Sequence, residues 1–132
     1  MTNSRNKGKK GELEIAYILR DRGYDARRGQ QYCGANGDAD VVGVPGLHIE
    51  VKRTEACHPY KYIEQAENDA NDDEIPVVFH RQSRKKWIAM LDMETFLKLY
   101  EMAQYANLKE DEYWDKVTNH IRVKESKPTY WT

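Results

Sequence analysis

Polar and apolar residues near the start of the chain follow helical spacing. The pattern predicts an amphipathic helix over residues 11–22 with Gly23 as its C-cap. Glu12 interrupts the apolar face of this helix, because its neighbours at i+3, i+4 and i+7 are all apolar. A carboxylate on that face needs a partner. Alternatively, Glu12 is a first-turn acid that the helix dipole favours. The apolar positions that define the face are Ile15, Ile18 and Leu19.

Strand spacing follows further along the chain. The β-branched run 41–44 predicts a buried strand, and a Pro-Gly turn separates it from a second strand over 47–52. The other predicted elements are a strand within 24–30, a loop over 31–37, a helix over 60–71, strands over 75–80 and 86–91, helices over 92–106 and 111–120, and a frayed tail over 124–132.

Charged residues that could take part in catalysis or metal binding lie on and before the strand over 47–52. Glu50 and Lys52 are two residues apart and therefore share one face of that strand. Asp40 lies one short hairpin upstream, although Asp38 competes for the same role. Carboxylate and carbonyl oxygens bind hard divalent cations, so Asp40, Glu50 and the backbone carbonyl of Val51 are predicted to hold a metal ion.

Chemically, such an ion would polarise a phosphate and acidify a water. Lys52 would orient that water or offset charge in the transition state. Two simpler explanations stay open: Glu50 and Lys52 form an ion pair on a solvated face, and the two aspartates are turn residues.

Three of these segments together resemble the PD-(D/E)XK nuclease superfamily, and within it the archaeal-type Holliday junction resolvases and their phage relatives. The resemblance covers residues 7–92. Lys7-Gly8-x-x-Gly11-Glu12 is similar to the N-terminal motif, Gly37-Asp38-Ala39-Asp40-Val41-Val42 to the aspartate segment, and Ile49-Glu50-Val51-Lys52 to the second half. Ala39 replaces the proline that often precedes the family's aspartate. The resemblance implies that Glu12 completes the metal site and that Gln65, on the following helix, lies near it.

The implied fold is α/β, a restriction-endonuclease-like αβββαβ core with a mixed central sheet and an added C-terminal helical segment. A single nuclease domain is expected over 1–132, with its core over 7–106 and a C-terminal helix and tail over 107–132. The implied activity is that of a Mg²⁺-dependent endodeoxyribonuclease acting on branched DNA, with Mn²⁺ as a substitute ion. A nickase, a restriction or repair nuclease, and a non-catalytic DNA-binding accessory protein are the alternatives, since substrate choice lies in loops.

Composition agrees with a small cytoplasmic enzyme, in the host cytoplasm if the gene is phage-encoded. The 132 residues have a mass of 15.5 kDa and a mean hydropathy of -0.92, and no stretch suits a membrane span or a signal peptide. Cys33 and Cys57 lack zinc-finger spacing, which favours reduced thiols. Zinc binding by Cys57-His58 with His48 or His80 would lack a second close pair.

A net charge of -1 does not exclude DNA, because the charges are segregated. Basic clusters of this kind are typical of phosphate-contacting surfaces, although each is also compatible with an ordinary solvated face. The candidate DNA-binding residues are Lys7, Lys9, Lys10, Arg27, Arg28, Arg81, Arg84, Lys85 and Lys86. The aromatic residues from Tyr100 to Trp114 exceed the needs of a small core and predict a homodimer contact.

Overall fold

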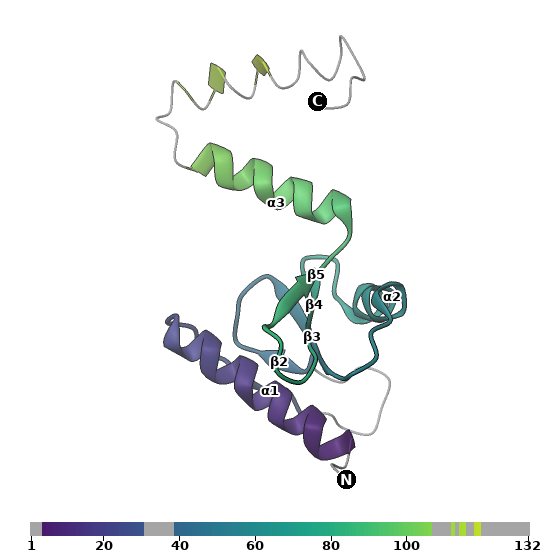
Figure 1. Cartoon of the computed structure of the whole chain (residues 1–132). Helices are drawn as coiled ribbons and strands as arrows, with labels where there is room; N and C mark the ends of the chain where they lie inside the picture. The colour runs from purple at the N-terminus through teal and green to yellow at the C-terminus, as the bar shows by residue number, and fades with distance from the viewer. Residues whose placement is uncertain (1–3, 31–38, 107–111, 113, 116–117, 120–132) are drawn as a thin grey trace. The chain divides into compact units, whose positions relative to one another are not determined.

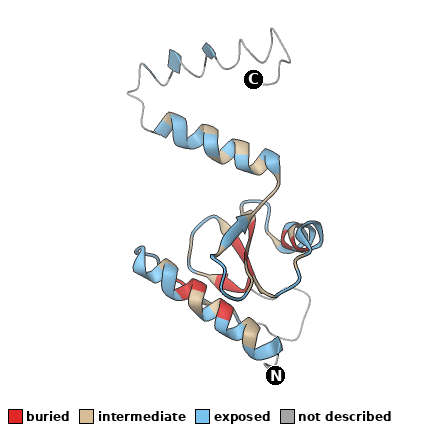
Figure 2. Ribbon diagram, in the orientation of Figure 1, coloured by how far each residue is buried: buried red, intermediate tan, exposed pale blue. Residues whose placement is uncertain are grey.

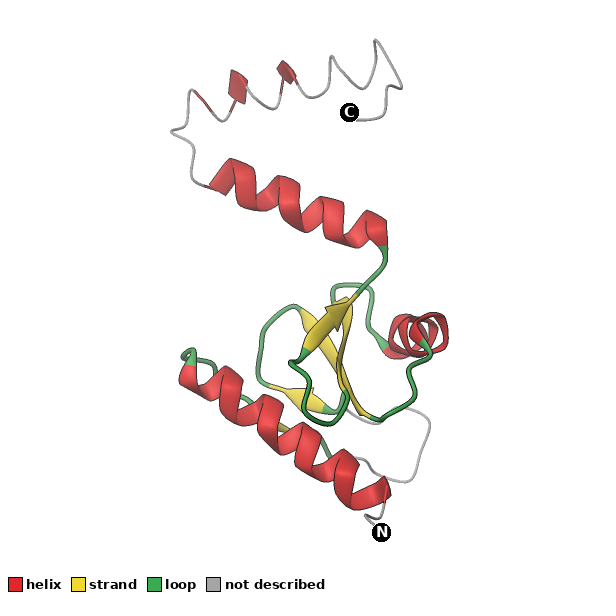
Figure 3. Cartoon of the chain, in the orientation of Figure 1, coloured by secondary structure: helices red, strands yellow, loops and turns green. Residues whose placement is uncertain are grey.

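The computed structural model describes residues 4–30, 39–106, 112, 114–115 and 118–119. The chain divides into two compact units, residues 1–92 and residues 93–132. The elements of the first unit are α1 (Ser4–Asp21), β1 (Arg27–Arg28), β2 (Val41–Val42), β3 (Leu47–Arg53), α2 (Pro59–Asp69), β4 (Ile75–Arg81) and β5 (Ile88–Met90). The second unit contains α3 (Met93–Ala106). Figure 1 labels these elements, and Figure 3 colours them by type.

The first unit is built on one mixed sheet with the strand order β1-β2-β3-β4-β5. Neighbouring strands are antiparallel except β3 and β4, which are parallel. A parallel pair needs a crossover connection, and α2 supplies it between β3 and β4. The predicted αβββαβ order and the mixed central sheet are therefore confirmed.

Helices cover both faces of this sheet. On one face, Ile15 and Ala16 of α1 belong to a core cluster with Ile49 and Val51 of β3. On the other face, Tyr62 and Ala66 of α2 pack with Val78 of β4. Figure 2 shows the buried positions on α1, on α2 and within the strands. Because β3 is covered on both sides, residues 48–51 are buried on either face of this strand.

The first helix is longer than predicted. It begins at Ser4 rather than at Gly11, because the basic segment before Gly11 contains no proline to stop a helix, while the apolar stripe used for the prediction begins later. Its end agrees with the prediction: Gly23 has φ +97° and donates its N–H to the Arg20 carbonyl.

Two strands are shorter than predicted, since β1 and β2 each contain only two residues. The predicted loop over 31–37, the tail over 124–132, and most of the predicted helix over 111–120 lie outside the described residues.

Close packing of α1 on β3 depends on Gly11. This residue is buried, and a Cβ atom at its position would lie 2.8 Å from Cβ of Arg53 and 3.4 Å from Cγ1 of Val51. Glycine therefore lets the helix backbone approach the strand directly beside Glu12.

In the second unit, α3 has no buried residue, and Met93, Phe96, Tyr100 and Met102 are exposed. The rings of Phe96 and Tyr100 stack with centroids 6.4 Å apart. None of the helices in the described part of the chain has the length and apolar character needed to cross a bilayer. The single-domain organisation over 1–132 stays a prediction.

Candidate active site

Two buried carboxyl groups meet beside β3, the central strand of the sheet. Asp40 lies directly before β2 and Glu50 lies in β3, with exposed fractions of 8% and 5%. The backbone N–H of Val51 donates to Asp40 Oδ2 at 2.8 Å. Burial raises the pKa of Asp40 to about 7, and so do the hydrogen bond and the negative charge of Glu50. Near neutral pH the Asp40 carboxyl can therefore keep its proton and donate it to Glu50 in a hydrogen bond.

Glu50 remains the ionised member of the pair. Burial alone would raise its pKa, but hydrogen bonds from His48 and Asp40, together with the positive charges of His48 and Lys52, outweigh burial and lower it. His48 Nε2 lies 2.7 Å from Glu50 Oε1, and His48 itself is buried. The hydrogen bond to Glu50 raises the pKa of His48 against the effect of burial. Glu50 is thus held between a carboxyl group and an imidazole.

Lys52 lies two residues further along the same face of β3. Its Nζ donates to Gln65 Oε1 of α2 at 3.0 Å and lies 5.3 Å from the ring centroid of Tyr62. The alternation along β3 therefore brings Lys52 and Glu50 to one side of the sheet, and α2 brings Gln65 to the amine. A cation over an aromatic face is further restrained by the ring quadrupole.

Glu12 comes from α1 and is the most distant of the predicted residues in the sequence. Its side chain is 14% exposed, and its Oε1 accepts a hydrogen bond from Arg28 Nε at 3.1 Å. Its negative charge contributes to the raised pKa of Asp40. The structure therefore gives this acid the partner that its place on the helix face requires, and it lies near enough to act on the carboxyl pair.

The donor chemistry of this group suits a hard divalent cation. Two buried carboxyl groups side by side are stable only with a proton or a cation between them, and oxygen donors favour Mg²⁺ or Mn²⁺. A second grouping exists among the described residues, in which ligand atoms of His48, Glu50 and Asp69 lie within 4.8 Å of one another. However, His48 Nε2 is already engaged with Glu50, and Asp69 is exposed. Asp40 and Glu50, in contrast, are both buried and both offer the oxygen ligands that a hard divalent cation prefers.

Several predicted DNA-binding residues form ion pairs at the protein surface. Lys7 pairs with Glu55, Arg28 with Glu12 and Arg81 with Glu14. The others are exposed and lie on α1, on β1 and in the loop between β4 and β5: Lys9, Lys10, Arg27, Arg84, Lys85 and Lys86. Asp38, the alternative to Asp40, lies outside the described residues.

Sequence reasoning missed the role of His48, which was considered only as a zinc ligand. The alternation that paired Glu50 with Lys52 also brings His48 to the same face, so the signal was present. It also missed Glu14, whose Oε1 accepts hydrogen bonds from Arg81 and from Trp87 Nε1. Those partners are 67 and 73 residues away, and no local pattern indicates them.

A mixed αβββαβ sheet with a buried aspartate beside a Glu-x-Lys strand defines the PD-(D/E)XK class of nuclease. The chain belongs to the family described as "Phage putative PDDEXK endonuclease", whose model matches residues 3–130. Nucleases of this class generally use divalent metal ions.

A comparison with curated proteins gives no significant match. Among solved structures, the Holliday junction resolvase Hjc of the archaeal hyperthermophile Archaeoglobus fulgidus is similar, with a TM-score of 0.48 and 23% identity. The similarity covers 64% of this chain and 71% of that one.

Proposed function

We propose that this protein is a Mg²⁺-dependent endodeoxyribonuclease that hydrolyses phosphodiester bonds in branched DNA, as a Holliday junction resolvase does. The observation that carries the proposal is the buried pair of Asp40 and Glu50, which share a hydrogen bond. When both groups are ionised, the two carboxylates repel each other, and a bound cation would offset this repulsion. Membership of an endonuclease family supports phosphodiester hydrolysis as the reaction.

Asp40, Glu50 and the backbone carbonyl of Val51 would hold the ion, with Glu12 completing the site. The Val51 N–H faces Asp40, and in an extended strand the carbonyl of the same residue points toward the same edge. When bound, the ion supplies Lewis-acid polarisation of the scissile phosphate and lowers the pKa of the attacking water.

The remaining residues orient the reacting groups and offset charge. His48 donates a hydrogen bond to Glu50 and so fixes the direction of its carboxylate. Lys52 would position the attacking water or offset the charge that develops on the phosphate. Gln65 accepts the hydrogen bond from Lys52 and thereby keeps the amine over the site.

The basic residues of α1, β1 and the loop between β4 and β5 would contact backbone phosphates. Affinity for DNA should then fall steeply with salt, by about 0.9 in the log–log slope for each phosphate neutralised. Neutralising Lys9 and Lys10 together should flatten the slope. An affinity that does not change with salt would exclude these residues from the interface.

We also propose a homodimer, because resolving a junction requires two symmetric cuts and a two-fold dimer supplies two sites. The exposed apolar residues of α3, including Phe96, Tyr100 and Met102, support a contact between copies. Light scattering at micromolar concentration, with and without DNA, measures the assembly state. A strictly monomeric protein that cuts only one junction strand would contradict the dimer and the resolvase activity.

A comparison of three substrates tests the proposed activity. A four-way junction, a linear duplex and a flap of matched sequence are each incubated with Mg²⁺, with Mn²⁺ and with a chelator. We expect paired cuts in the junction with either ion and no cleavage in the chelator. Equal cleavage of the linear duplex would favour a restriction or repair nuclease. DNA binding without cleavage under any condition would favour the accessory protein.

A further inference from the structure

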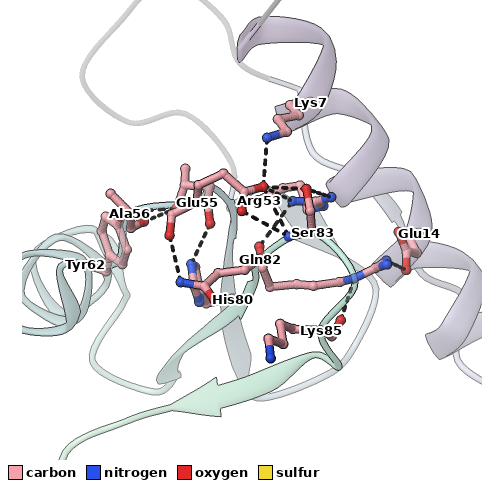
Figure 4. Close-up of polar contacts among 12 residues, drawn as sticks. Lys7, Glu14, Arg53, Glu55, Ala56, Tyr62, His80, Gln82, Ser83 and Lys85 are labelled. Atoms are coloured by element: carbon pink, nitrogen blue, oxygen red, sulfur yellow. Dashed lines mark hydrogen bonds and ion pairs between the residues drawn. The ribbon is translucent and has the colours of Figure 1, made fainter. Parts of the chain in front are cut away.

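Glu55 lies in the loop between β3 and α2, and its carboxylate accepts hydrogen bonds from three separate segments of the chain. Lys7 Nζ of α1 lies 3.0 Å from Oε1, and Arg53 Nη1 of β3 lies 3.4 Å from the same oxygen. Ser83, between β4 and β5, donates its backbone N–H at 3.1 Å and also its hydroxyl. Figure 4 shows these donors converging on Glu55.

These donors are of the types that bind phosphate. Two cations, a hydroxyl and a backbone N–H are the groups that most often contact phosphate oxygens in nucleic-acid complexes. The Glu55 side chain is 55% exposed, and exposed ion pairs contribute little to stability. Hydrogen bonds from Ser83 and Lys7 lower the pKa of Glu55 to about 2, so these donors favour an anion. The cluster is therefore better explained by anion recognition than by stabilisation of the fold.

The donors adjoin the candidate active site along two elements. Arg53 follows Lys52 in β3, and its Cβ lies against α1 at Gly11, next to Glu12. Its guanidinium is further held by Ser83 Oγ at 3.2 Å. Arg53 therefore points to the α1 face of β3, opposite to Glu50 and Lys52. A DNA strand bound at the carboxyl pair would meet this cluster by passing around the carboxyl end of β3.

Only the Glu55 side chain would have to move to release the donors. Gln82 Nε2 donates to the backbone carbonyl of Glu55 at 2.7 Å. On either side of Glu55, the His80 ring hydrogen-bonds the Thr54 carbonyl at 3.0 Å, and the Tyr62 hydroxyl donates to the Ala56 carbonyl at 3.3 Å. These contacts fix the backbone of the loop, and the carboxylate can rotate away while the loop stays in place.

We propose that Lys7, Arg53 and Ser83 form a binding site for a DNA backbone phosphate, and that Glu55 occupies this site until DNA displaces it. The proposal rests on the proposed nuclease function, which supplies the DNA. Glu55 then acts as an internal competitor. It lowers affinity for nucleic acid and keeps the cations from binding other anions.

The first test compares Glu55→Gln with the unchanged protein for binding a duplex, with Ca²⁺ in place of Mg²⁺ to limit cleavage. We expect Glu55→Gln to bind roughly three- to tenfold more tightly, because loss of the negative charge leaves Lys7 and Arg53 available to the phosphate. We also expect the log–log slope of affinity against salt to be steeper by about one. In Glu55→Gln, Lys7 and Arg53 would bind salt anions in the free protein, and DNA would displace those anions instead of the Glu55 carboxylate. Weaker binding by Glu55→Gln would mean that Glu55 holds the donors in position for DNA, and it would overturn the proposal.

Two controls separate site occupancy from a general change in charge. Glu67→Gln removes the same charge from an exposed position on α2 and should alter affinity by less than about twofold. In a Ser83→Ala background, the gain from Glu55→Gln should shrink, since one donor to the phosphate is gone. A gain of the same size in both backgrounds would indicate general electrostatics and overturn the proposal.

A phosphate titration decides the anion site without DNA. Inorganic phosphate should shift the amide NMR signal of Ser83 in Glu55→Gln at concentrations that leave the unchanged protein unaffected. Circular dichroism melts check that both proteins are folded. The absence of a shift in Glu55→Gln would overturn the site. A shift in a protein that binds no DNA would instead overturn the proposed function and leave an anion site.

Discussion

The two faces of β3 are both buried, yet they are built from opposite chemistry. Toward α1 the strand presents Ile49 and Val51, whereas toward α2 it presents His48, Glu50 and Lys52. Ile49 is 0% exposed and Glu50 is 5% exposed, so burial does not distinguish them. Burial on one face excludes water from the core. On the other face it places charges in a medium where each requires a partner.

The two faces should therefore respond differently to substitution. The α1 face gains its energy from apolar contact, so a deletion there costs stability. The α2 face is held by hydrogen bonds and opposite charges, and removing one buried acid also removes the repulsion between Asp40 and Glu50. Substitutions that keep the shape on this face should change chemistry more than folding.

The largest expected effect is the loss of cleavage in Asp40→Asn or Glu50→Gln. Each removes a carboxylate proposed to hold the ion, so we expect the rate to fall by roughly 10³-fold or more. Tm in the chelator should stay the same or rise in Asp40→Asn, because the raised pKa of Asp40 means that its ionised form destabilises the folded protein. Tm should fall in Glu50→Gln, because the lowered pKa of Glu50 means that its charge stabilises the fold and because His48 loses its charged partner. Cleavage of a four-way junction beside a thermal melt gives both values.

Asp69→Asn is the matched control, since Asp69 belongs only to the alternative grouping with His48 and Glu50. This variant should cleave normally. Loss of activity in Asp69→Asn, with normal activity in Asp40→Asn, would move the proposed ion to that grouping.

On the opposite face, Ile49→Ala should destabilise the protein by about 2–5 kcal/mol, because Ile49 is fully buried and its loss leaves a cavity. Below the melting transition, the rate of cleavage per folded molecule should stay within about threefold. Urea unfolding measures the stability, and Ile88→Ala, at a 43% exposed position, is the control, with an expected effect within about 0.5 kcal/mol. Equal costs at the two positions would contradict the assignment of Ile49 to the core.

Lys52→Ala should lower the rate of the chemical step by about 10²-fold while changing affinity little, because the amine is proposed to act in the transition state. Single-turnover kinetics at saturating enzyme separates the two quantities. Lys61→Ala, an exposed lysine of α2, should leave both unchanged. Weaker binding by Lys52→Ala with a normal rate would make Lys52 an ordinary phosphate contact.

The sequence was sufficient to predict the order of the elements and one face of the site. Alternation along 47–52 indicated that Glu50 and Lys52 lie together, and the same alternation would have included His48. The boundaries of the elements were harder to predict, because the basic start of α1 carries no apolar stripe and β1 and β2 contain only two residues each.

Contacts between segments that are distant in the sequence could not be predicted. Glu55 meets Ser83 across 28 residues, and Arg81 meets Glu14 across 67. Such pairs depend on how the strands, loops and helices pack together, and neither residue of a pair carries a local signal of its partner. The cluster around Glu55 therefore becomes visible only in three dimensions.

The last expected effect is a pH dependence of stability that arises on the polar face of β3. Asp40 has a pKa of about 7 in the folded protein, whereas the ordinary pKa of an aspartate is 3.8. Between these values the folded state holds more protons than the unfolded state, so stability falls as pH rises from about 4 to about 7. The raised pKa of His48 acts in the same direction above 6.5, the ordinary pKa of a histidine.

Melting in a chelator across this range should therefore give a Tm that decreases with pH, by roughly 4–8 °C for each kcal/mol lost in a unit of this size. Mg²⁺ should raise Tm more at pH 8 than at pH 5, since the ion replaces the proton between Asp40 and Glu50. Asp40→Asn should reduce the slope, whereas Asp69→Asn should keep it. A Tm that rises steadily from pH 4 to pH 7 would mean that the two carboxyl groups do not share a proton, and the contrast between the faces of β3 would then be one of shape rather than of charge.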